Sequence, residues 1–579
     1  MSARRSPVTG SIIILSDGST RAAGAGGIVP EPPFSRTARA RSLAAIACVG
    51  LALLVLAGQL VRLALMGQNR EEVAISTPIA TGFARPEIVD RNGRLIAADV
   101  PLPSLFANPS IVIDRDEMSE KLTRVLPDLD AGAVRASLAD KSRRFVWLRR
   151  GLAPALAQQV HDLGLPGLGF RDELRRIYPA EGLAGHAIGY VDIDNRGQSG
   201  IERYLDEQRL IEPVQGAVPA GAPPVSLSID IGVQHALEQE LAAGLARYRA
   251  DAGLAIVMDA ISGEVIASAS VPGVDPARPT TFLDKARLDR VLASTYEMGS
   301  VLKVFTIAMA LEEGLADLST TIDVRQPIEV DGYTIAEHVD PGRPLSLSEI
   351  LARSSNVGVG RLALAAGAER QRRFFERLGL TTEMKTELGP VARARLPGRL
   401  GASETVTLSY GHGLALAPLQ LLAATAALVN GGTPVTPTWI RKREGTAMGE
   451  GQPPAGSPVV SAATSAAINH MLREVVVGPS GTGRRADVPG FEVGGKTGTA
   501  EIVRDGRYDK SAVIASFLGA FPMSAPRYVI LVSLFEPQPT GETGGAVTAA
   551  HNAAPTTAAI VARIAPRLGV RPIDRPQGG

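Results

Sequence analysis

The sequence has few of the residues on which disulfide scaffolds, metal sites and thiol enzymes depend. Its 579 residues include one cysteine, Cys48, so an internal disulfide is excluded. Its seven histidines are scattered, and none stands at metal-ligand spacing from another. We therefore expect no zinc site and no cysteine–histidine nucleophile, and we predict that the protein works without a metal or a cofactor.

An excess of one charge sign is also missing. The chain has 60 Lys and Arg against 59 Asp and Glu, a formal net charge of +1, and no charged block that would suggest a nucleic-acid partner. Hydrophobic residues make up 45% and charged residues 21%, which is ordinary for a globular chain and excludes a wholly disordered one. A chain of this length is expected to fold as several domain-sized units.

One long hydrophobic run stands near the N-terminus. Residues 42–61, SLAAIACVGLALLVLAGQLV, carry no charge, and about 20 apolar residues let a helix cross a bilayer. Arg36, Arg39 and Arg41 precede the run, so the positive-inside rule predicts that 1–41 is a cytoplasmic, disordered tail and that the rest of the chain lies outside. A cleaved signal peptide is the alternative, but the whole of such a signal is usually ~15–30 residues long, whereas residues 1–41 already precede this apolar run. We interpret 42–61 as an uncleaved transmembrane signal anchor.

Two folded regions are expected after the anchor. Residues 70–224 mix short β-rich pieces with turns, and the stretch GAVPAGAPP (216–224) is typical of a linker. Between 225 and 569 the expected elements are a helix at 233–248, a β-hairpin at 253–259 and 264–270, strands at 494–503, 512–521 and 527–535, and a helix at 553–568. Strands at both ends with helices between them indicate an α+β fold, in which distant segments form one antiparallel sheet. Residues 570–579 are expected to be a disordered end.

Lysine is scarce, with eight residues in an arginine-dominated basic set. Arginine keeps its proton at any useful pH, whereas a desolvated lysine can lose it and act as a base. Only Lys303 has a serine, Ser300, three residues before it. The spacing of 300–315 predicts a helix, which brings the Lys303 amine towards the Ser300 hydroxyl and places a developing oxyanion at the helix N-terminus. Leu302 and Phe305 are expected to lower the pKa of Lys303. By itself, however, the tetrapeptide also fits an ordinary capped helix with a solvated lysine.

Two further motifs change this balance. Ser354-Ser355-Asn356 follows a predicted capping box, Ser346 to Glu349, and should therefore lie in a connector between two helices. Lys496-Thr497-Gly498-Thr499 opens a predicted strand, where Gly498 would let a ligand backbone come close and the lysine and threonines would face an anionic group. Each motif alone is compatible with a polar turn or a surface strand. In this order, the three motifs match the serine acyl-enzyme arrangement of penicillin-binding proteins and β-lactamases.

Other nucleotide-binding and hydrolase patterns fail. Residues 478–485 have the glycine spacing of a phosphate-binding loop, but arginines stand where lysine and serine or threonine are required. No G-x-S-x-G elbow is present.

The chain therefore resembles the class B penicillin-binding proteins, and within them the division-specific peptidoglycan D,D-transpeptidases of Gram-negative bacteria (FtsI type). Besides the anchor and the three motifs, the resemblance rests on Arg85-Pro86, Asp90-Arg91-Asn92-Gly93, Arg176-Ile177-Tyr178-Pro179, Gly197-Gln198-Ser199-Gly200-Ile201-Glu202, the run 409–432 and Gly544-Gly545. Asn356 favours the division enzyme over its elongation relative, which typically has aspartate there. Met298 and Val301 depart from the proline and threonine common in the family.

The resemblance implies a fold and a set of roles. The region 70–224 would be a mixed α/β, non-catalytic pedestal of the dimerisation type, and 225–569 a transpeptidase domain with a five-stranded antiparallel sheet, like that of serine β-lactamases. Ser300 would attack the bond between two terminal D-alanines with Lys303 as base, and Ser354 and Asn356 would relay the proton. Lys496, Thr497, Gly498 and Thr499 would bind the terminal carboxylate or a β-lactam, and the N–H groups of Ser300 and Thr499 would form the oxyanion hole.

The resemblance also implies a place and partners. The protein would cross the bacterial inner membrane once, with its catalytic domain in the periplasm, and crosslink peptidoglycan stem peptides at the septum. Its anchor and pedestal would contact a membrane glycan polymerase (FtsW type) and other division proteins.

The residues leave several alternatives open. An elongation-specific transpeptidase, a D,D-carboxypeptidase and a β-lactamase would use the same nucleophile, and the motifs do not choose between an amine and water as acceptor. The long pedestal and the anchor favour a transpeptidase at a fixed membrane position. A β-lactam-sensing receptor would need a signalling module, and an inactive scaffold should have lost a motif residue.

Overall fold

The computed structural model describes residues 36–74, 82–214, 223–337, 339–442, 457–504 and 507–573. The chain divides into two compact units, 1–79 and 80–579. In the first unit, α1 (Arg36–Ala74) is one continuous helix that includes the predicted anchor, 42–61. Residues 36–41, which the sequence analysis assigned to a disordered tail, belong to this helix. Among the described helices, none meets the joint length and hydropathy criteria for a membrane span, so the membrane anchor stays a prediction. The rest of the predicted tail at 1–41, and most of 216–224 and 570–579, lie outside the described residues.

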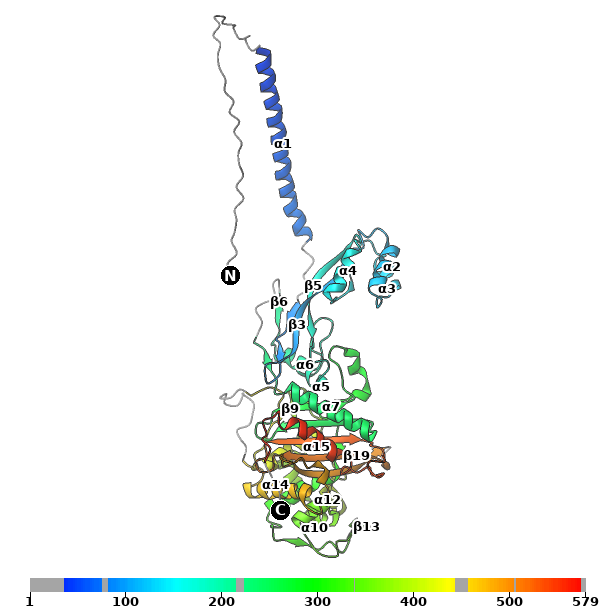
Figure 1. The fold of residues 1–579 in the computed structure, drawn as a ribbon, viewed down its shortest axis with the longest axis vertical. Helices are drawn as coiled ribbons and strands as arrows, with labels where there is room; N and C mark the ends of the chain where they lie inside the picture. The colour runs from blue at the N-terminus through cyan, green and yellow to red at the C-terminus, as the bar shows by residue number, and fades with distance from the viewer. Residues whose placement is uncertain are drawn as a thin grey trace, which may run out of the picture. The chain divides into compact units, whose positions relative to one another are not determined.

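Residues from about 105 to 170 of the pedestal region form a small subdomain. Strands β3 (Leu95–Ala107) and β5 (Leu168–Ile177) form a long antiparallel pair, and β4 (Val146–Arg149) pairs with the end of β3. Helices α2 (Arg115–Val125), α3 (Ala131–Ser137) and α4 (Pro154–Asp162) lie around that end (Figure 1). Their apolar faces pack with Leu105 and Leu168 into one cluster. This subdomain therefore has its own hydrophobic core.

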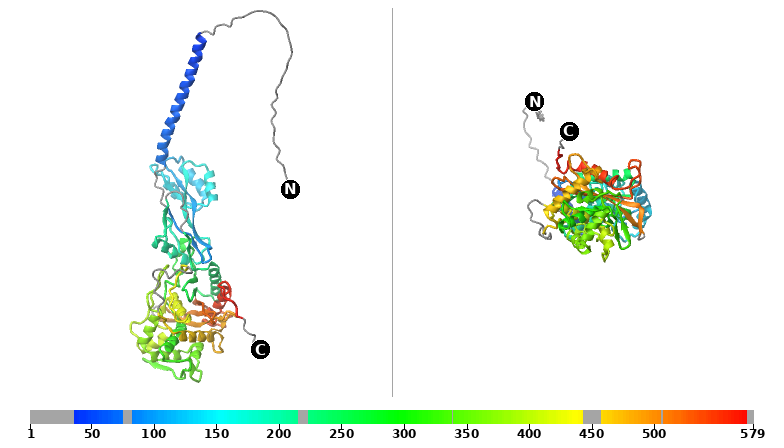
Figure 2. Two further views of the ribbon diagram at one scale, coloured as in Figure 1. Left: turned by 90° about the vertical axis from the view of Figure 1, so that its left-hand side faces the viewer. Right: turned by 90° about the horizontal axis from the view of Figure 1, so that it is seen from below.

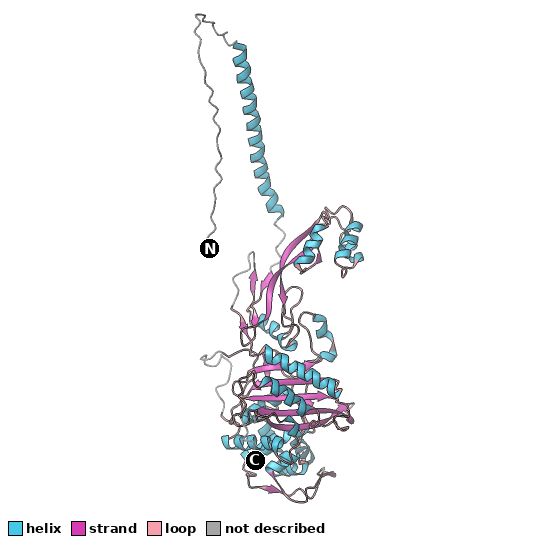
Figure 3. Ribbon diagram, in the orientation of Figure 1, coloured by secondary structure: helices cyan, strands magenta, loops and turns pink. Residues whose placement is uncertain are grey.

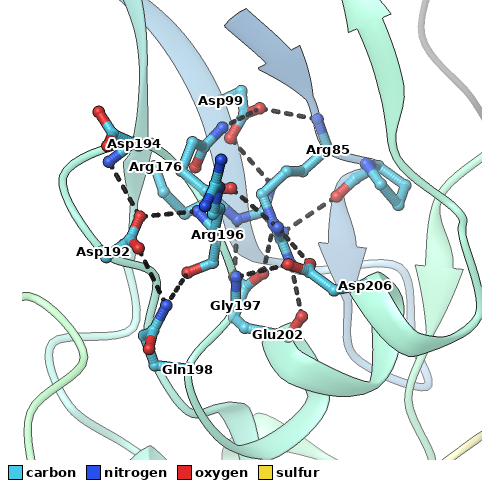
Figure 4. Close-up of polar contacts among 12 residues, drawn as sticks. Arg85, Asp99, Arg176, Asp192, Asp194, Arg196, Gly197, Gln198, Glu202 and Asp206 are labelled. Atoms are coloured by element: carbon cyan, nitrogen blue, oxygen red, sulfur yellow. Dashed lines mark hydrogen bonds and ion pairs between the residues drawn. The ribbon is translucent and has the colours of Figure 1, made fainter.

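Ion pairs between buried arginine and glutamate side chains connect separate segments of the pedestal region (Figure 4). Arg85 Nε and Arg176 Nε donate to the two oxygens of the Glu202 carboxylate, at 2.8 and 2.7 Å. All three side chains are fully buried, and Asp99 and Asp206 supply further carboxylates to the two arginines. Three motifs that lie far apart in the sequence thus meet in one ion-pair network.

The base of the pedestal is continuous with the C-terminal region. Strand β2 (Ile88–Val89) pairs with β3 and also, in parallel, with β7 (Val225–Ser226), which follows the predicted linker. Side chains from β2, β3, α5 (Gly185–Ile188) and α6 (Gly200–Glu207) share one hydrophobic cluster with the C-terminal sheet and helices. The pedestal therefore packs against the C-terminal region through a common hydrophobic core, and is not joined to it by the covalent chain alone.

The predicted antiparallel sheet is present, with the order β18–β19–β20–β8–β9 (Figure 3). Its strands are β8 (Ala252–Asp259), β9 (Val265–Val271), β18 (Gly494–Arg504), β19 (Arg507–Phe521) and β20 (Tyr528–Phe535). Strands from the two ends of the region meet where β20 pairs with β8. The strand β18, which carries the Lys-Thr-Gly motif, lies at the edge of the sheet.

Helices cover both faces of this sheet. Along β8, Ile256 and Met258 belong to one hydrophobic cluster and Ala255 and Val257 to the other, because successive side chains of a strand point to opposite faces. Helices α7 (Ile231–Tyr248) and α15 (Ala553–Ile564) pack on one face and lie side by side in Figures 1 and 2. Helices α8 (Lys303–Glu312), α13 (Pro418–Val429) and α14 (Ala462–Val477) pack on the other face.

The remaining elements are short. They are β1 (Gly82–Ala84), β6 (Glu212–Val214), η1 (Pro279–Leu283), η2 (Lys285–Arg287), β10 (Tyr296–Glu297), η3 (Gly299–Leu302), β11 (Thr321–Ile322), β12 (Ile328–Val330), β13 (Tyr333–Ile335), β14 (Leu345–Ser346), α9 (Leu347–Arg353), α10 (Asn356–Ala366), α11 (Ala368–Arg377), β15 (Lys385–Thr386), β16 (Gly389–Pro390), α12 (Ala402–Ser409), β17 (Ala415–Leu416) and η4 (Arg484–Ala486).

Candidate active site

The predicted nucleophile lies on a tight turn that opens a buried helix. Ser300 belongs to the 3-10 turn η3, and Lys303 is the first residue of α8. The helix predicted at 300–315 is thus present as a 3-10 turn that continues directly into α8. In a 3-10 turn, residues three apart eclipse each other, so Ser300 and Lys303 still share a side. The side chain of Ser300 is half-buried, whereas Lys303 is 1% exposed.

The Lys303 amine is held by the second motif. Its Nζ contacts the backbone oxygen of Ser354 and forms hydrogen bonds with Ser354 Oγ at 3.0 Å and Asn356 Oδ1 at 2.6 Å. No hydrogen bond joins Nζ and Ser300 Oγ in the described part of the chain, so the approach of the amine to the serine stays a prediction. Catalytic hydrogen bonds are often long in free enzymes and shorten only in the complex.

The second motif lies in a helix–helix connector, as predicted. The capping box at Ser346 and Glu349 starts α9, which ends at Ser354 in the left-handed conformation, with φ 63° and ψ 42°. Ser355 then caps α10, because its Oγ accepts the N–H of Gly358 at 2.8 Å. The sharp change of direction between the two helices aims Ser354 and Asn356 at the same amine.

The third motif is buried along the first part of the edge strand β18. Lys496 is completely buried, and its Nζ donates to the backbone oxygen of Thr497 at 2.9 Å. Thr499 Oγ1 accepts the N–H of Ala549 at 3.1 Å. A Cβ on Gly498 would lie 2.9 Å from Val301 Cγ1 and 3.2 Å from Val301 N. The close approach expected of a ligand at Gly498 is thus made by the chain's own η3, and this contact fixes the strand against the nucleophile's turn.

Burial controls the charge of both lysines. It lowers the pKa of Lys496 to about 7. The pKa of Lys303 is held well below its ordinary value, mainly by burial and to a smaller extent by the nearby charge of Lys496. The Glu337 carboxylate acts in the opposite direction and raises this pKa. A neutral Lys303 amine can accept a proton, so the prediction of a base at this position has a physical cause in the structure.

Two residues at the site carried no recognisable signal in the sequence. Thr482 Oγ1 accepts a hydrogen bond from Thr497 Oγ1 at 2.9 Å, and its N–H donates to Ala352 O at 3.2 Å. It comes from residues 478–485, which have the glycine spacing but not the other residues of a phosphate-binding loop, and it links the third motif to α9, the helix that precedes the second motif. Glu337 accepts from Ser355 and Val357.

A cavity of about 540 Å³ lies beside the motifs. It is lined by residues on either side of the site in sequence, since Glu297 precedes Ser300 by three positions and Glu501 follows Thr499 by two. Tyr508 donates its hydroxyl to Glu297, at 3.1 and 3.2 Å from the two carboxylate oxygens. Apolar walls come from Leu396, Ile502 and their neighbours. The volume is within the range of small-molecule binding sites.

The arrangement has the features of a serine acyltransferase: a serine hydroxyl on a tight turn, a buried lysine amine with a lowered pKa, and a second lysine on an edge strand. Residues 253–560 match the family model of the penicillin-binding protein transpeptidase domain. The chain is a penicillin-binding protein. A second model, the penicillin-binding protein dimerisation domain, matches residues 82–210.

Curated relatives share most of this penicillin-binding protein's length. It is 37% identical over 497 residues to "Probable peptidoglycan D,D-transpeptidase FtsI" of Caulobacter vibrioides, covering 84% of this chain and 82% of the relative. It is 30% identical to "Peptidoglycan D,D-transpeptidase FtsI" of Escherichia coli, covering 75% and 74%. The structure resembles penicillin-binding protein 3 of Mycobacterium tuberculosis complexed with ampicillin, with a TM-score of 0.65 and 25% identity over 86% of this chain and 98% of that one.

These matches establish two parts of the penicillin-binding protein's architecture. It is a class B penicillin-binding protein with a mixed α/β dimerisation or pedestal domain followed by a transpeptidase domain. Both matched segments fall inside the ranges expected from the sequence, 70–224 and 225–569.

Proposed function

We propose that the protein is a peptidoglycan D,D-transpeptidase that crosslinks stem peptides of the septal cell wall through an acyl-enzyme on Ser300. The observation that carries the proposal is the state of Lys303: a fully buried amine, one 3-10 turn from the serine and held by Ser354 and Asn356. The names of the FtsI relatives support the substrate class and the septal role.

Acylation begins with proton transfer from the Ser300 hydroxyl to the neutral Lys303 amine. Ser300 Oγ then forms a bond to the carbonyl carbon that joins the two terminal D-alanines, and the carbonyl π electrons move onto oxygen. The backbone N–H groups of Ser300 and Thr499 stabilise that oxyanion, and removing one such donor typically costs about 10²–10³ in rate.

Collapse of the tetrahedral intermediate breaks the bond to the leaving D-alanine nitrogen. Ser354 Oγ, 3.0 Å from Lys303 Nζ, passes a proton to that nitrogen and is reprotonated from the ammonium. Asn356 keeps the amine in place for this exchange. The terminal carboxylate is bound by the Lys496 ammonium with Thr497 and Thr499, and Gly498 keeps their strand close to the nucleophile.

An amine of a second stem peptide then attacks the acyl carbon, displaces Ser300 Oγ and completes the crosslink. The cavity beside Glu297 accommodates peptide that precedes the two D-alanines. A D,D-carboxypeptidase or a β-lactamase would use water in place of the amine. β-Lactams mimic the D-alanine pair and leave Ser300 acylated.

The site of action follows from the anchor. Residues 42–61 cross the bacterial inner membrane once, with the N-terminus in the cytoplasm and the catalytic domain in the periplasm. Anchor and pedestal contact a membrane glycan polymerase of the FtsW type and other division proteins. A fluorescent fusion in a mid-cell ring supports the division role, whereas a signal along the lateral wall supports the elongation alternative.

The test of the activity uses the full chain in detergent with a donor stem pentapeptide and an amine acceptor. The expected products are D-alanine and the crosslinked peptide, and Ser300→Ala should form neither. D-Alanine without crosslinked product at saturating acceptor would instead identify a carboxypeptidase. A labelled penicillin separates the remaining rival, because turnover of the adduct within seconds would indicate a β-lactamase.

A further inference from the structure

A carboxylate outside all three motifs contacts the connector between α9 and α10. Glu337 Oε1 accepts hydrogen bonds from Ser355 Oγ at 2.5 Å and from the backbone N–H of Val357 at 2.9 Å. These two donors flank Asn356. Glu337 is half-buried and belongs to the segment between β13 and β14. One side chain thus ties a separate loop to the residues on both sides of a predicted catalytic group.

The connector needs such support because its backbone is strained. Ser354 has φ 63°, a left-handed conformation that is unfavourable for a residue other than glycine. Lys303 Nζ holds the Ser354 carbonyl oxygen from the side of the cleft. Glu337 contacts the next residues, Ser355 and Val357, and satisfies an N–H of the first turn of α10. The two contacts together fix the direction of Ser354 and Asn356.

The same carboxylate acts on the charge of the base. Two elements packed around Lys303 bring charged groups that affect it: β18 contributes Lys496, and the loop before β14 contributes Glu337. Lys496 disfavours a proton on Lys303 and Glu337 favours one. Ser354 and Asn356, which touch the amine directly, are uncharged.

We propose that Glu337 is a positioning residue for acylation of Ser300, which fixes the Ser354–Asn356 connector and sets, by its charge, the lower end of the pH range in which Lys303 works. The inference rests on the proposed function, because it assigns Lys303 the role of base. A purely structural N-terminal contact to α10 would stabilise the fold without moving a pH profile.

The experiment measures the second-order rate of Ser300 acylation by a fluorescent penicillin against pH, on the full chain in detergent. Glu337→Gln keeps an oxygen acceptor and removes the charge. The pKa of Lys303 then falls, so the rise of the rate with pH should move to lower pH, with the plateau within about threefold of wild type. Glu337→Ala removes the acceptor as well, and its plateau should fall by about tenfold.

A matched control and clear outcomes complete the design. Glu329→Gln neutralises an exposed carboxylate on β12 that binds Thr334, and its profile should match wild type. If the rise of the acylation rate with pH occurs at the same pH in Glu337→Gln as in wild type, the proposal is overturned, whatever the alanine variant does. If Glu337→Ala does not fold, the glutamine variant, checked by thermal unfolding, decides alone. Failure of the wild-type chain to be acylated at any pH would instead refute the proposed function.

Discussion

Replacement of Gly498 by alanine tests how closely the edge strand must lie against the nucleophile's turn. The new Cβ would lie 2.9 Å from Val301 Cγ1, 3.2 Å from Val301 N and closer still to the carbonyl oxygen of Met298. Carbon atoms in contact are normally about 3.5–4.0 Å apart, so strand and turn would have to separate by roughly 0.6–1.1 Å. A change of the Val301 rotamer would relieve only the Cγ1 contact, because the contacts with Met298 O and Val301 N are made by backbone atoms.

The size of the effect follows from that displacement. The turn carries Ser300, and the strand carries Lys496 and Thr499, the proposed oxyanion donor. The movement therefore increases the distance between the proposed nucleophile and the groups proposed to bind its substrate. A misplacement of about 1 Å costs on the order of 10²-fold in rate. Overpacking of this kind should also lower the free energy of unfolding by about 1–3 kcal/mol.

The assay is the rate of acylation by a fluorescent penicillin, with thermal unfolding measured on the same samples. Gly541→Ala is the matched control, because its Cβ would meet no atom within 4 Å. It should leave the acylation rate unchanged. A Gly498→Ala protein that is acylated at the wild-type rate would refute the reasoning that this contact sets the geometry.

Predictions at three further residues follow from the structure: Lys496, Thr482 and Glu202. With a pKa of about 7, Lys496 loses its ammonium charge in the free protein as pH rises, so acylation by carboxylate-bearing substrates should decline above neutral pH, and Lys496→Arg should move that decline to higher pH. The unfolded chain keeps this proton up to the ordinary pKa of 10.5, so the contribution of Lys496 to the free energy of unfolding, measured in urea against Lys496→Met, should increase between about pH 7 and 10.5. Thr482→Val removes the acceptor of the Thr497 hydroxyl and should slow acylation by about tenfold, with Thr482→Ser restoring it. Glu202→Ala leaves two buried arginines without their shared carboxylate and should cost about 3–5 kcal/mol in urea unfolding, whereas exposed Glu207→Ala should cost less than about 0.5.

Local patterns predicted many of the elements well. The hairpin expected at 253–259 and 264–270 is β8 and β9, and the three later strands are β18, β19 and β20, because alternation and turn residues are local signals. The capping box predicted at Ser346 is also present, because it too is a local sequence pattern. The helix predicted at 300–315 begins with a 3-10 turn at Ser300, because sequence spacing does not separate a short 3-10 turn from the helix that continues it.

The assembly of the site depended on long-range packing that no local pattern encodes. Lys303 and Ser354 are 51 positions apart, yet they are in hydrogen-bond contact. Their meeting was expected only through family resemblance. Thr482 and Glu337 stayed unseen because each acts through hydrogen bonds to residues remote in sequence. Gly498 was recognised as a place of close approach, but the sequence could not tell that the chain's own turn occupies it.

The account depends most on Ser300 being the acylated group. Peptide-mapping mass spectrometry of the full chain after brief exposure to penicillin at neutral pH tests this directly. The predicted result is one penicilloyl adduct on the peptide that contains Ser300, absent from Ser300→Ala and much reduced in Lys303→Met. An adduct on another residue, or equal labelling of the Lys303→Met protein, would contradict the account.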